Sequence, residues 1–237
     1  MALDVDVLVF DVFGTVVDWR GSIIMEGETR WKTQGLDVEW GAFADEWRAG
    51  YQPAMDKIRS GEAKWASIDA LHRQILDGLL DKYQITHLTE SQTHELNHIW
   101  HRLQPWADSV AGIQRLREDH TVTTLSNGNM SLLVALSKQA GLQWDCILSA
   151  ELAHHYKPDL ETYRMACALL DVSPERALMV ASHRGDLLAS RQIGMKTAFV
   201  RRPLEYGANG IPDDPDPQFD LVVDDFLDLH RQLDGSG

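Results

Sequence analysis

The sequence predicts an α/β protein with a doubly wound parallel sheet and a helical subdomain inserted after the first strand. Short apolar runs rich in valine alternate with helical stretches in the second half of the chain, which is the pattern of βαβ units. These runs are almost continuously apolar, as in strands that are buried on both faces. Roughly 100 residues that favour helix separate the first run from the second.

The elements follow from this pattern in chain order. Strands are expected at 5–11, 121–126, 146–150, 177–182, 196–200 and 220–225. Helices are expected between the later strands, at 132–141, 160–171 and 187–194; the first and third end at a glycine, as helices often do. The inserted segment is expected to hold helices at about 22–35, 40–60, 64–83 and 89–103. The predicted division is therefore a core of residues 1–18 and 105–237 and a cap of residues 19–104. Residues 205–218, rich in Pro, Gly and Asp, are predicted to form a surface loop.

Composition narrows the classes of partner. The formal net charge of −14 argues against a nucleic acid or an anionic membrane, since phosphates are bound by clustered Lys and Arg. No apolar run approaches about 18 residues and the N-terminus lacks a basic leader, so we expect a cytoplasmic protein that contacts no membrane. The two cysteines, Cys146 and Cys167, lack metal-ligand spacing and are expected to be reduced thiols.

Polar residues follow several of the predicted strands. Ligands of open parallel sheets bind beyond the carboxyl ends of the strands, where this chain places Asp11, Thr15, Ser126, Asn127, Lys157, Ser182, His183 and Asp186. Each has an ordinary structural explanation: a strand-terminal Asp can cap a turn, Ser-Asn-Gly commonly forms a turn, and a Lys before Pro is usually solvated. Their ordered occurrence at one edge favours a catalytic or binding site.

These residues resemble, in order, the four motifs of the haloacid dehalogenase superfamily: Asp11-Val-Phe-Gly-Thr, Ser126-Asn127, Lys157-Pro158 and Asp186. The resemblance covers the whole chain, including the helical cap after the first motif. It implies a Rossmann-like core in which Asp11 is the nucleophile.

The reaction class is indicated by departures from the superfamily's phosphatases. Those enzymes resemble one another in a second Asp two residues after the nucleophile, where this chain has Phe13. Counting back twelve residues from Gly194 puts Ser182 where their fourth motif supplies an acid to Mg²⁺, an ion that prefers carboxylate oxygens. We therefore expect no metal and no other cofactor.

An aromatic residue at position 13 is similar to the type II L-2-haloacid dehalogenases, which act without a metal. The stretch "EWRAGY" resembles the cap segment that supplies their essential Arg, here Arg48, and "YKPDLETY" resembles their segment with a catalytic Lys and a Tyr, here Lys157 and Tyr163. The resemblance implies metal-independent hydrolysis of a short 2-haloalkanoic acid, an L-2-haloacid or a haloacetate, through an ester of Asp11. The expected partner is thus a small anionic halogenated carboxylic acid. Related dehalogenases are often dimers, which leaves a homodimer open.

Each side chain has an expected role. Asp11 attacks carbon, and a halide leaves as an anion without needing a proton, so Phe13 can replace an acid. Lys157 would keep Asp11 ionised, and Thr15 would orient the Asp11 carboxylate. Asp186 would pair with Lys157 and help to position or deprotonate the hydrolytic water. Arg48 and Asn127 are expected at the halide, and Ser126 with the amides after Asp11 at the substrate carboxylate.

The fourth motif departs from the dehalogenases as well. It has Ala181-Ser182-His183 where their typical run is Ser-Ser-Asn. His183 is expected to donate to the nucleophile or the water, to narrow the halide pocket in favour of smaller halogens including fluoride, or to support its neighbours only. Tyr163 is assigned either to the site or to helix packing. Two alternatives stay open: a Mg²⁺-dependent phosphatase with a degraded metal site, and a non-catalytic member that binds a small anion or a protein.

Overall fold

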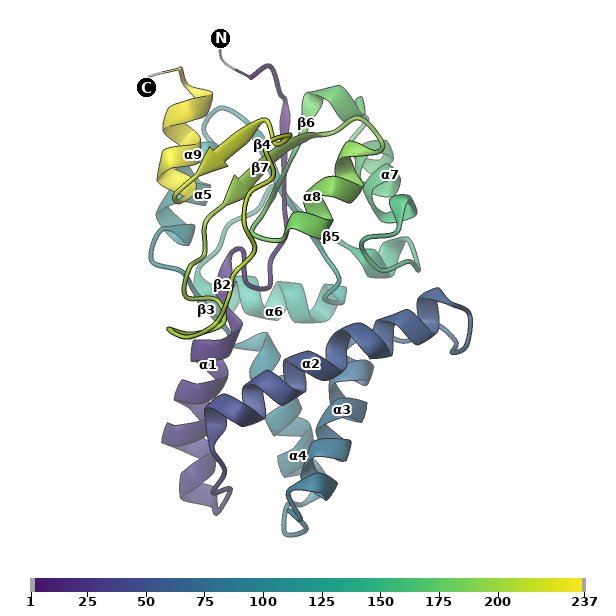
Figure 1. The fold of residues 1–237 in the computed structure, drawn as a ribbon, viewed down its shortest axis with the longest axis vertical. Coiled ribbons are helices and arrows are strands. Elements are labelled where there is room, and N and C mark those ends of the chain that lie inside the picture. Colours follow the sequence, from purple (N-terminus) through teal and green to yellow (C-terminus); the bar gives the residue numbers. More distant parts are fainter. Residues whose placement is uncertain (1–2, 236–237) are drawn as a thin grey trace.

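The computed structural model describes residues 3–235 and shows a sheet-containing core with a helical cap beneath it (Figure 1). The core sheet has six parallel strands in the order β5-β4-β1-β6-β7-β8. Their bounds are β1 Val7–Phe10, β4 Thr121–Ser126, β5 Cys146–Ser149, β6 Ala177–Ala181, β7 Lys196–Val200 and β8 Leu221–Val223. The predicted α/β class and all six predicted strands are confirmed.

Helices cover both faces of the sheet, so it is doubly wound. The helices are α5 Ser109–Leu116, α6 Met130–Ala140, α7 Leu160–Leu169, α8 Arg184–Arg191 and α9 Phe226–Leu233, with short 3-10 turns at Ala150–Leu152 and Pro174–Arg176. Leu8 and Phe10 of β1 pack into the cluster that includes α5, α6 and α9, whereas Val7 and Val9 pack into the cluster that includes α7 and α8. This explains why every residue of β1 is apolar.

The cap consists of helices whose core is rich in tryptophan. They are α1 Trp19–Glu26, α2 Trp40–Arg59, α3 Ile68–Lys82 and α4 Glu90–Asn97. A π turn at Gly27–Trp31 and a 3-10 turn at Lys32–Gln34 extend α1, and a 3-10 turn at His98–His101 extends α4. Ser67 caps α3, which therefore begins later than the sequence predicted. Five tryptophans are fully buried here: Trp19, Trp31, Trp40, Trp47 and Trp100.

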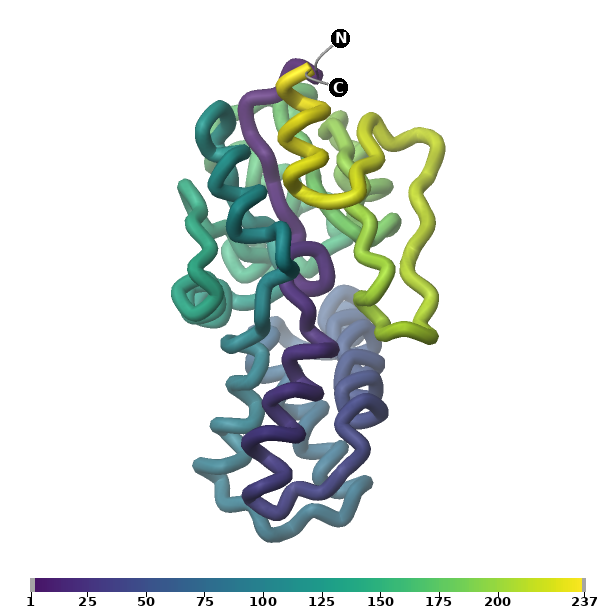
Figure 2. Tube along the Cα trace, turned by 90° about the vertical axis from the view of Figure 1, so that its left-hand side faces the viewer, coloured from purple at the N-terminus to yellow at the C-terminus, as the bar shows by residue number. Residues whose placement is uncertain are grey.

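A two-stranded antiparallel ribbon joins core and cap. Strand β2 (Val17–Asp18) pairs with β3 (Gln104–Pro105), so the two crossings of the chain lie side by side (Figure 2). The sequence did not predict this ribbon, because two residues are too few to show a strand pattern. We propose that it marks the boundary between the expected core and cap.

None of the helices formed by residues 3–235 combines the length and the apolar character needed to cross a bilayer.

Candidate active site

A cavity of about 400 Å³ lies between the carboxyl edge of the sheet and the cap helix α2. Both parts contribute side chains to its wall. The core supplies Asp11, Phe13, Asn127, Lys157, Pro158, His183, Gly185 and Asp186, and α2 supplies Arg48, Tyr51, Gln52, Met55 and Arg59. Thr15, Ser126, Tyr163 and Ser182 are not among the lining residues. The structure thus brings most of the predicted site residues together and sets four of them behind the wall.

One face of α2 forms the cap side of the cavity. The lining residues recur every three or four positions, from Arg48 through Tyr51 and Met55 to Arg59, as they must on one side of a helix. The Arg48 guanidinium lies 4.4 Å from the centre of the Tyr51 ring, and it makes no ion pair with any residue in the described range 3–235. Arg59, by contrast, reaches across to Asp159 at the start of α7, at 2.8 Å. Of these two arginines, Arg48 is therefore the one whose charge is available to bind an anion in the cavity.

Asp11 follows β1, and its carboxylate is surrounded by donors. Lys157 Nζ donates to Oδ1 at 2.8 Å, while Thr15 Oγ1 donates to Oδ2 at 2.6 Å. His183 Nδ1 lies 3.0 Å from the same Oδ2. Burial alone would raise the pKa of Asp11, but the positive charges of Lys157 and His183 outweigh it and hold this pKa far below its usual range. Asp11 is ionised although its exposed fraction is only 6%.

Asp186, at the start of α8, shares the Lys157 ammonium with Asp11. Lys157 Nζ donates to its Oδ2 at 2.5 Å, and the Tyr163 hydroxyl donates to its Oδ1. Burial raises the pKa of Asp186 and the nearby Asp11 carboxylate adds to this, despite the opposing effect of Lys157. The pKa values of the two carboxylates are thus pushed apart, as in pairs where one attacks and the other accepts a proton.

His183 lies between Asp11 and Glu205, a residue that the sequence analysis missed. Its Nε2 lies 2.9 Å from Glu205 Oε1. Glu205 begins the predicted surface loop 205–218, and for this residue the prediction was wrong: it is 2% exposed, whereas Ile211 farther along is 90% exposed. The loop runs down toward the cap before it returns to β8 (Figure 2), and no local pattern signals that its first acid is buried.

The remaining predicted residues shape the turns around the cavity. Asn127 Oδ1 accepts from the Lys157 backbone N–H at 2.8 Å, which ties the turns after β4 and β5 together. Ser126 is fully buried, and its hydroxyl accepts from the Gly128 N–H at 3.1 Å. Ser182 lies beside Thr15, with 3.1 Å between the two hydroxyl oxygens. Direct contact of Ser126 with a substrate carboxylate stays a prediction.

Phe13 lies in the turn that follows Asp11 and faces the cap. Its ring packs edge-on against Trp100, with 5.7 Å between the ring centres, and its exposed fraction is 4%. The position that would hold a second acid in a phosphatase is thus an apolar contact between core and cap.

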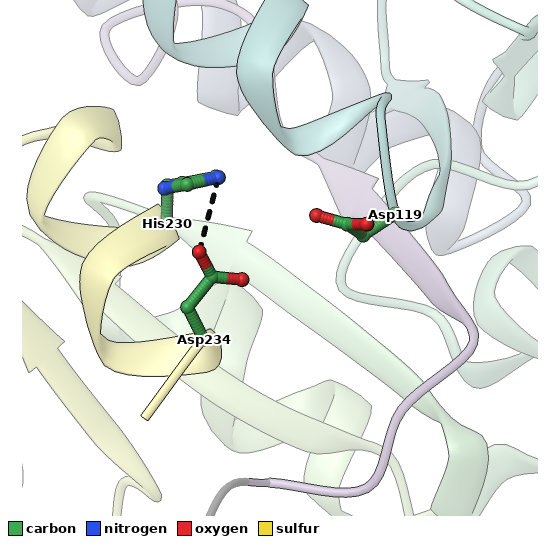
Figure 3. Close-up of side chains that lie close together, drawn as sticks. All are labelled: Asp119, His230 and Asp234. Carbon is green, nitrogen blue, oxygen red and sulfur yellow. Dashed lines mark ion pairs between the residues drawn. The ribbon is translucent and has the colours of Figure 1, made fainter. Parts of the chain in front are cut away.

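A different group of acidic and histidine side chains lies far from the cavity, near the two chain ends. Asp119, His230 and Asp234 place their oxygen and nitrogen atoms within 4.8 Å of one another (Figure 3). His230 and Asp234 are one helical turn apart on α9 and form an ion pair at 3.5 Å. Both aspartates are exposed, so an ordinary surface ion pair accounts for the group.

Comparison with known proteins agrees with this geometry. The family model of the haloacid dehalogenase-like hydrolases matches residues 5–194. The structure of the L-2-haloacid dehalogenase PA0810 is 43% identical, with a TM-score of 0.94 over 98% of this chain and 99% of that one. The defluorinating L-2-haloacid dehalogenase Rha0230 is 39% identical, with a TM-score of 0.94 over 97% and 95% of the two chains. The (S)-2-haloacid dehalogenase 1 of Pseudomonas sp. (strain CBS-3) is 25% identical over 84% of this chain and 86% of its own length. The chain therefore belongs to the haloacid dehalogenase-like hydrolases, among the L-2-haloacid dehalogenases.

Proposed function

We propose that this protein hydrolyses the carbon–halogen bond of short 2-haloalkanoic acids and releases 2-hydroxy acids with inversion at the carbon. The observation that carries the proposal is the ionised, buried Asp11 at the floor of a cavity whose opposite wall holds Arg48, a cation without an ion-pair partner among residues 3–235. The names of the three relatives compared above, all 2-haloacid dehalogenases, support the same substrate class.

In the first step, a carboxylate oxygen of Asp11 attacks the carbon that bears the halogen. An anionic nucleophile has no proton to lose, and the halide departs with the bonding electrons and needs no acid. Arg48 and the amide of Asn127 stabilise the charge that develops on the halide. Both side chains line the cavity opposite or beside Asp11. The product is an ester between Asp11 and the 2-hydroxy acid.

In the second step, water attacks the carbonyl carbon of that ester. Asp186 accepts the proton of the water, a role that its raised pKa supports. Lys157 holds Asp186 next to the reacting carbon through contacts of 2.5 Å to Asp186 and 2.8 Å to Asp11. Cleavage of the ester then regenerates Asp11 with one oxygen taken from water.

The residues around Asp11 do not fit a Mg²⁺ ion. Mg²⁺ requires an octahedral set of oxygen ligands, but the nearest candidate positions hold the phenyl ring of Phe13 and the hydroxyl of Ser182. Both oxygens of Asp11 also accept from cationic or hydroxyl donors. The proposed reaction therefore uses no metal at Asp11, and the phosphatase alternative lacks a set of carboxylate ligands there.

We further propose that haloacetates, including fluoroacetate, are substrates. His183 lines the cavity where the typical dehalogenases have the smaller Asn, and the ring of Phe13 closes another side. A narrow pocket favours a small halogen, and the similar dehalogenase Rha0230 is described as defluorinating.

The test measures halide release from chloroacetate, fluoroacetate and each enantiomer of 2-chloropropionate in the presence of EDTA. Asp11→Asn is the inactive variant, because it removes the nucleophilic charge and little volume. A single turnover in ¹⁸O water should place the label first in Asp11 and only later in the product. Halide release that requires Mg²⁺, or label that enters the product directly, would contradict the proposal.

A further inference from the structure

His183 is held between two carboxylates by both nitrogens of its ring. Nδ1 lies 3.0 Å from Asp11 Oδ2, and Nε2 lies 2.9 Å from Glu205 Oε1. An ionised carboxylate only accepts hydrogen bonds. Both contacts can therefore form at once only if each ring nitrogen carries a hydrogen, that is, if the ring is an imidazolium. No N–H of this ring is left to bind a halide.

Glu205 is fixed in place by groups from separate parts of the chain. Trp19 Nε1 donates to its Oε1 at 3.2 Å, and the hydroxyl of Ser182 donates to its Oε2 at 3.3 Å. Gly14 provides the space: a Cβ on Gly14 would lie 2.1 Å from Glu205 Oε1. The first motif, the fourth motif and the cap thus meet at this one carboxylate, which lines no part of the cavity.

The two oxygens of Asp11 have different surroundings. Oδ1 faces Lys157 at 2.8 Å, whereas Oδ2 receives Thr15 at 2.6 Å and His183 at 3.0 Å. Two donors converging on one oxygen are the arrangement of an oxyanion hole. We propose that Thr15 and His183 form the oxyanion site of the second step and that Glu205 is the positioning residue that holds His183 there. This inference rests on the proposed ester of Asp11.

Oδ1 of Asp11 carries the bond to the substrate carbon, and Oδ2 is the carbonyl oxygen of the ester. Water forms a bond to the carbonyl carbon and gives one proton to Asp186, while the carbonyl electrons move onto Oδ2, between Thr15 and His183. When the carbonyl re-forms, the bond between the carbonyl carbon and Oδ1 breaks, Oδ1 leaves as the hydroxyl oxygen of the product, and Asp186 returns its proton to that oxygen. The second proton of the water stays on the new oxygen of Asp11 and is then lost to solvent, which restores the carboxylate.

The charges around His183 support this assignment. Asp11 faces it from the end of β1 and Glu205 from the loop after β7, with Lys157 and Asp186 beyond Asp11 and Arg48 above on α2. Burial would lower the pKa of His183, but Glu205 and Asp11 outweigh it and raise this pKa to about 10. The imidazolium is therefore kept at neutral pH and lost only as the pH rises toward 10.

The test compares Glu205→Gln with the matched control Asp216→Asn. Asp216 lies on the same loop and is also buried, and it pairs with Arg184, the neighbour of His183, at 2.5 Å. The readouts are halide release from chloroacetate across the pH range and the fraction of protein that carries the carboxymethyl ester after an acid quench, measured by mass spectrometry.

We expect Glu205→Gln to slow the second step roughly tenfold to hundredfold at mildly alkaline pH and to accumulate the ester, because the ring then loses its proton near its ordinary pKa of about 6.5. Wild type and Asp216→Asn should keep the second step fast to higher pH than Glu205→Gln and accumulate little ester, because Glu205 still faces the ring when Asp11 is esterified. His183→Phe should also accumulate ester, and adding Glu205→Gln to it should have no further effect, since Glu205 acts through His183.

The outcomes separate this inference from the proposed function. If the wild type releases no halide and forms no ester, the proposed function fails and the inference fails with it. If the wild type turns over through the ester while Glu205→Gln matches Asp216→Asn in pH profile and ester fraction, only the inference is overturned. If Glu205→Gln does not fold, a His183→Phe variant without accumulated ester overturns the inference by itself.

Discussion

Replacing Lys157 by methionine tests whether its buried ammonium holds the site together. The side chains of Lys157, Asp11 and Asp186 are 6%, 9% and 8% exposed, with contacts of 2.8 and 2.5 Å. Coulomb's law with an effective dielectric constant of about 20 gives roughly 6 kcal/mol of attraction at 2.8 Å, before desolvation is subtracted. Breaking a buried ion pair by removing one partner typically costs about 3–5 kcal/mol. We expect Lys157→Met to lower the free energy of unfolding by that amount at neutral pH.

The loss of stability in Lys157→Met should depend on pH, because the protonation of Asp11 and Asp186 changes with pH. In the wild type the pKa of Asp11 is lowered, so its stabilising contribution is present above about pH 4 and is lost in more acid solution. Without Lys157, burial raises the pKa of Asp186 further above that of the unfolded chain, whereas Asp11 keeps the opposing charge of His183. Asp186 can then bind a proton as the pH falls, so the difference between variant and wild type should shrink from neutral pH toward about pH 4.

The assay is denaturant unfolding followed by tryptophan fluorescence, with Lys82→Met as the matched control. Lys82 contacts Glu46 at 2.7 Å, but its side chain is 61% exposed, so its removal should change the free energy of unfolding by at most about 1 kcal/mol. The reasoning is refuted if the two variants lose equal stability, or if the loss in Lys157→Met is the same at both ends of the pH range.

Three further predictions concern the cavity and the turn behind Asp11. Arg48→Gln should lower halide release by about a hundredfold or more in steady-state assays, with thermal unfolding little changed, since Arg48 has no ion pair among residues 3–235. Gly14→Ala should destabilise more than Gly61→Ala in thermal unfolding, and only Gly14→Ala should slow turnover. Both glycines have a positive φ, 83° and 78°, but only at Gly14 would the new Cβ strike Glu205. Phe13→Ala should lower the free energy of unfolding by about 3–5 kcal/mol in a denaturant titration, because it opens a cavity against the cap.

The convergence of the strand-end residues was predictable from the sequence. Asp11, Lys157 and Asp186 lie far apart along the chain, but the rule that parallel strands end at one edge brings them together. The path of the loops could not be predicted from the sequence. Glu205 stands in a polar segment with no regular pattern, and its burial depends on how residues 205–218 fold back beneath the sheet.

Elements were missed for a different reason. The short helix α5 precedes a predicted strand and the short helix α9 follows one. In α9, Phe226, Leu229 and Leu233 are buried at helical spacing, but a segment of eight residues shows this periodicity only weakly. In α2, aromatic residues occur on more than one side of the helix, because one side packs against the cap and another lines the cavity. The sequence therefore singled out Arg48 by resemblance, but not Tyr51 or Met55.

The arrangement of α2 separates substrate recognition and halide departure from the nucleophile and the proton transfer. Every cap residue that lines the cavity belongs to this one helix, whereas the groups that contact Asp11 come from the core. Substitutions along a single helical face can thus retune the preferred length and branching of the acid while the proton-transfer apparatus stays intact. Replacing α2 by the corresponding helix of a relative should therefore change the range of acids that are accepted while the surroundings of Asp11 stay the same.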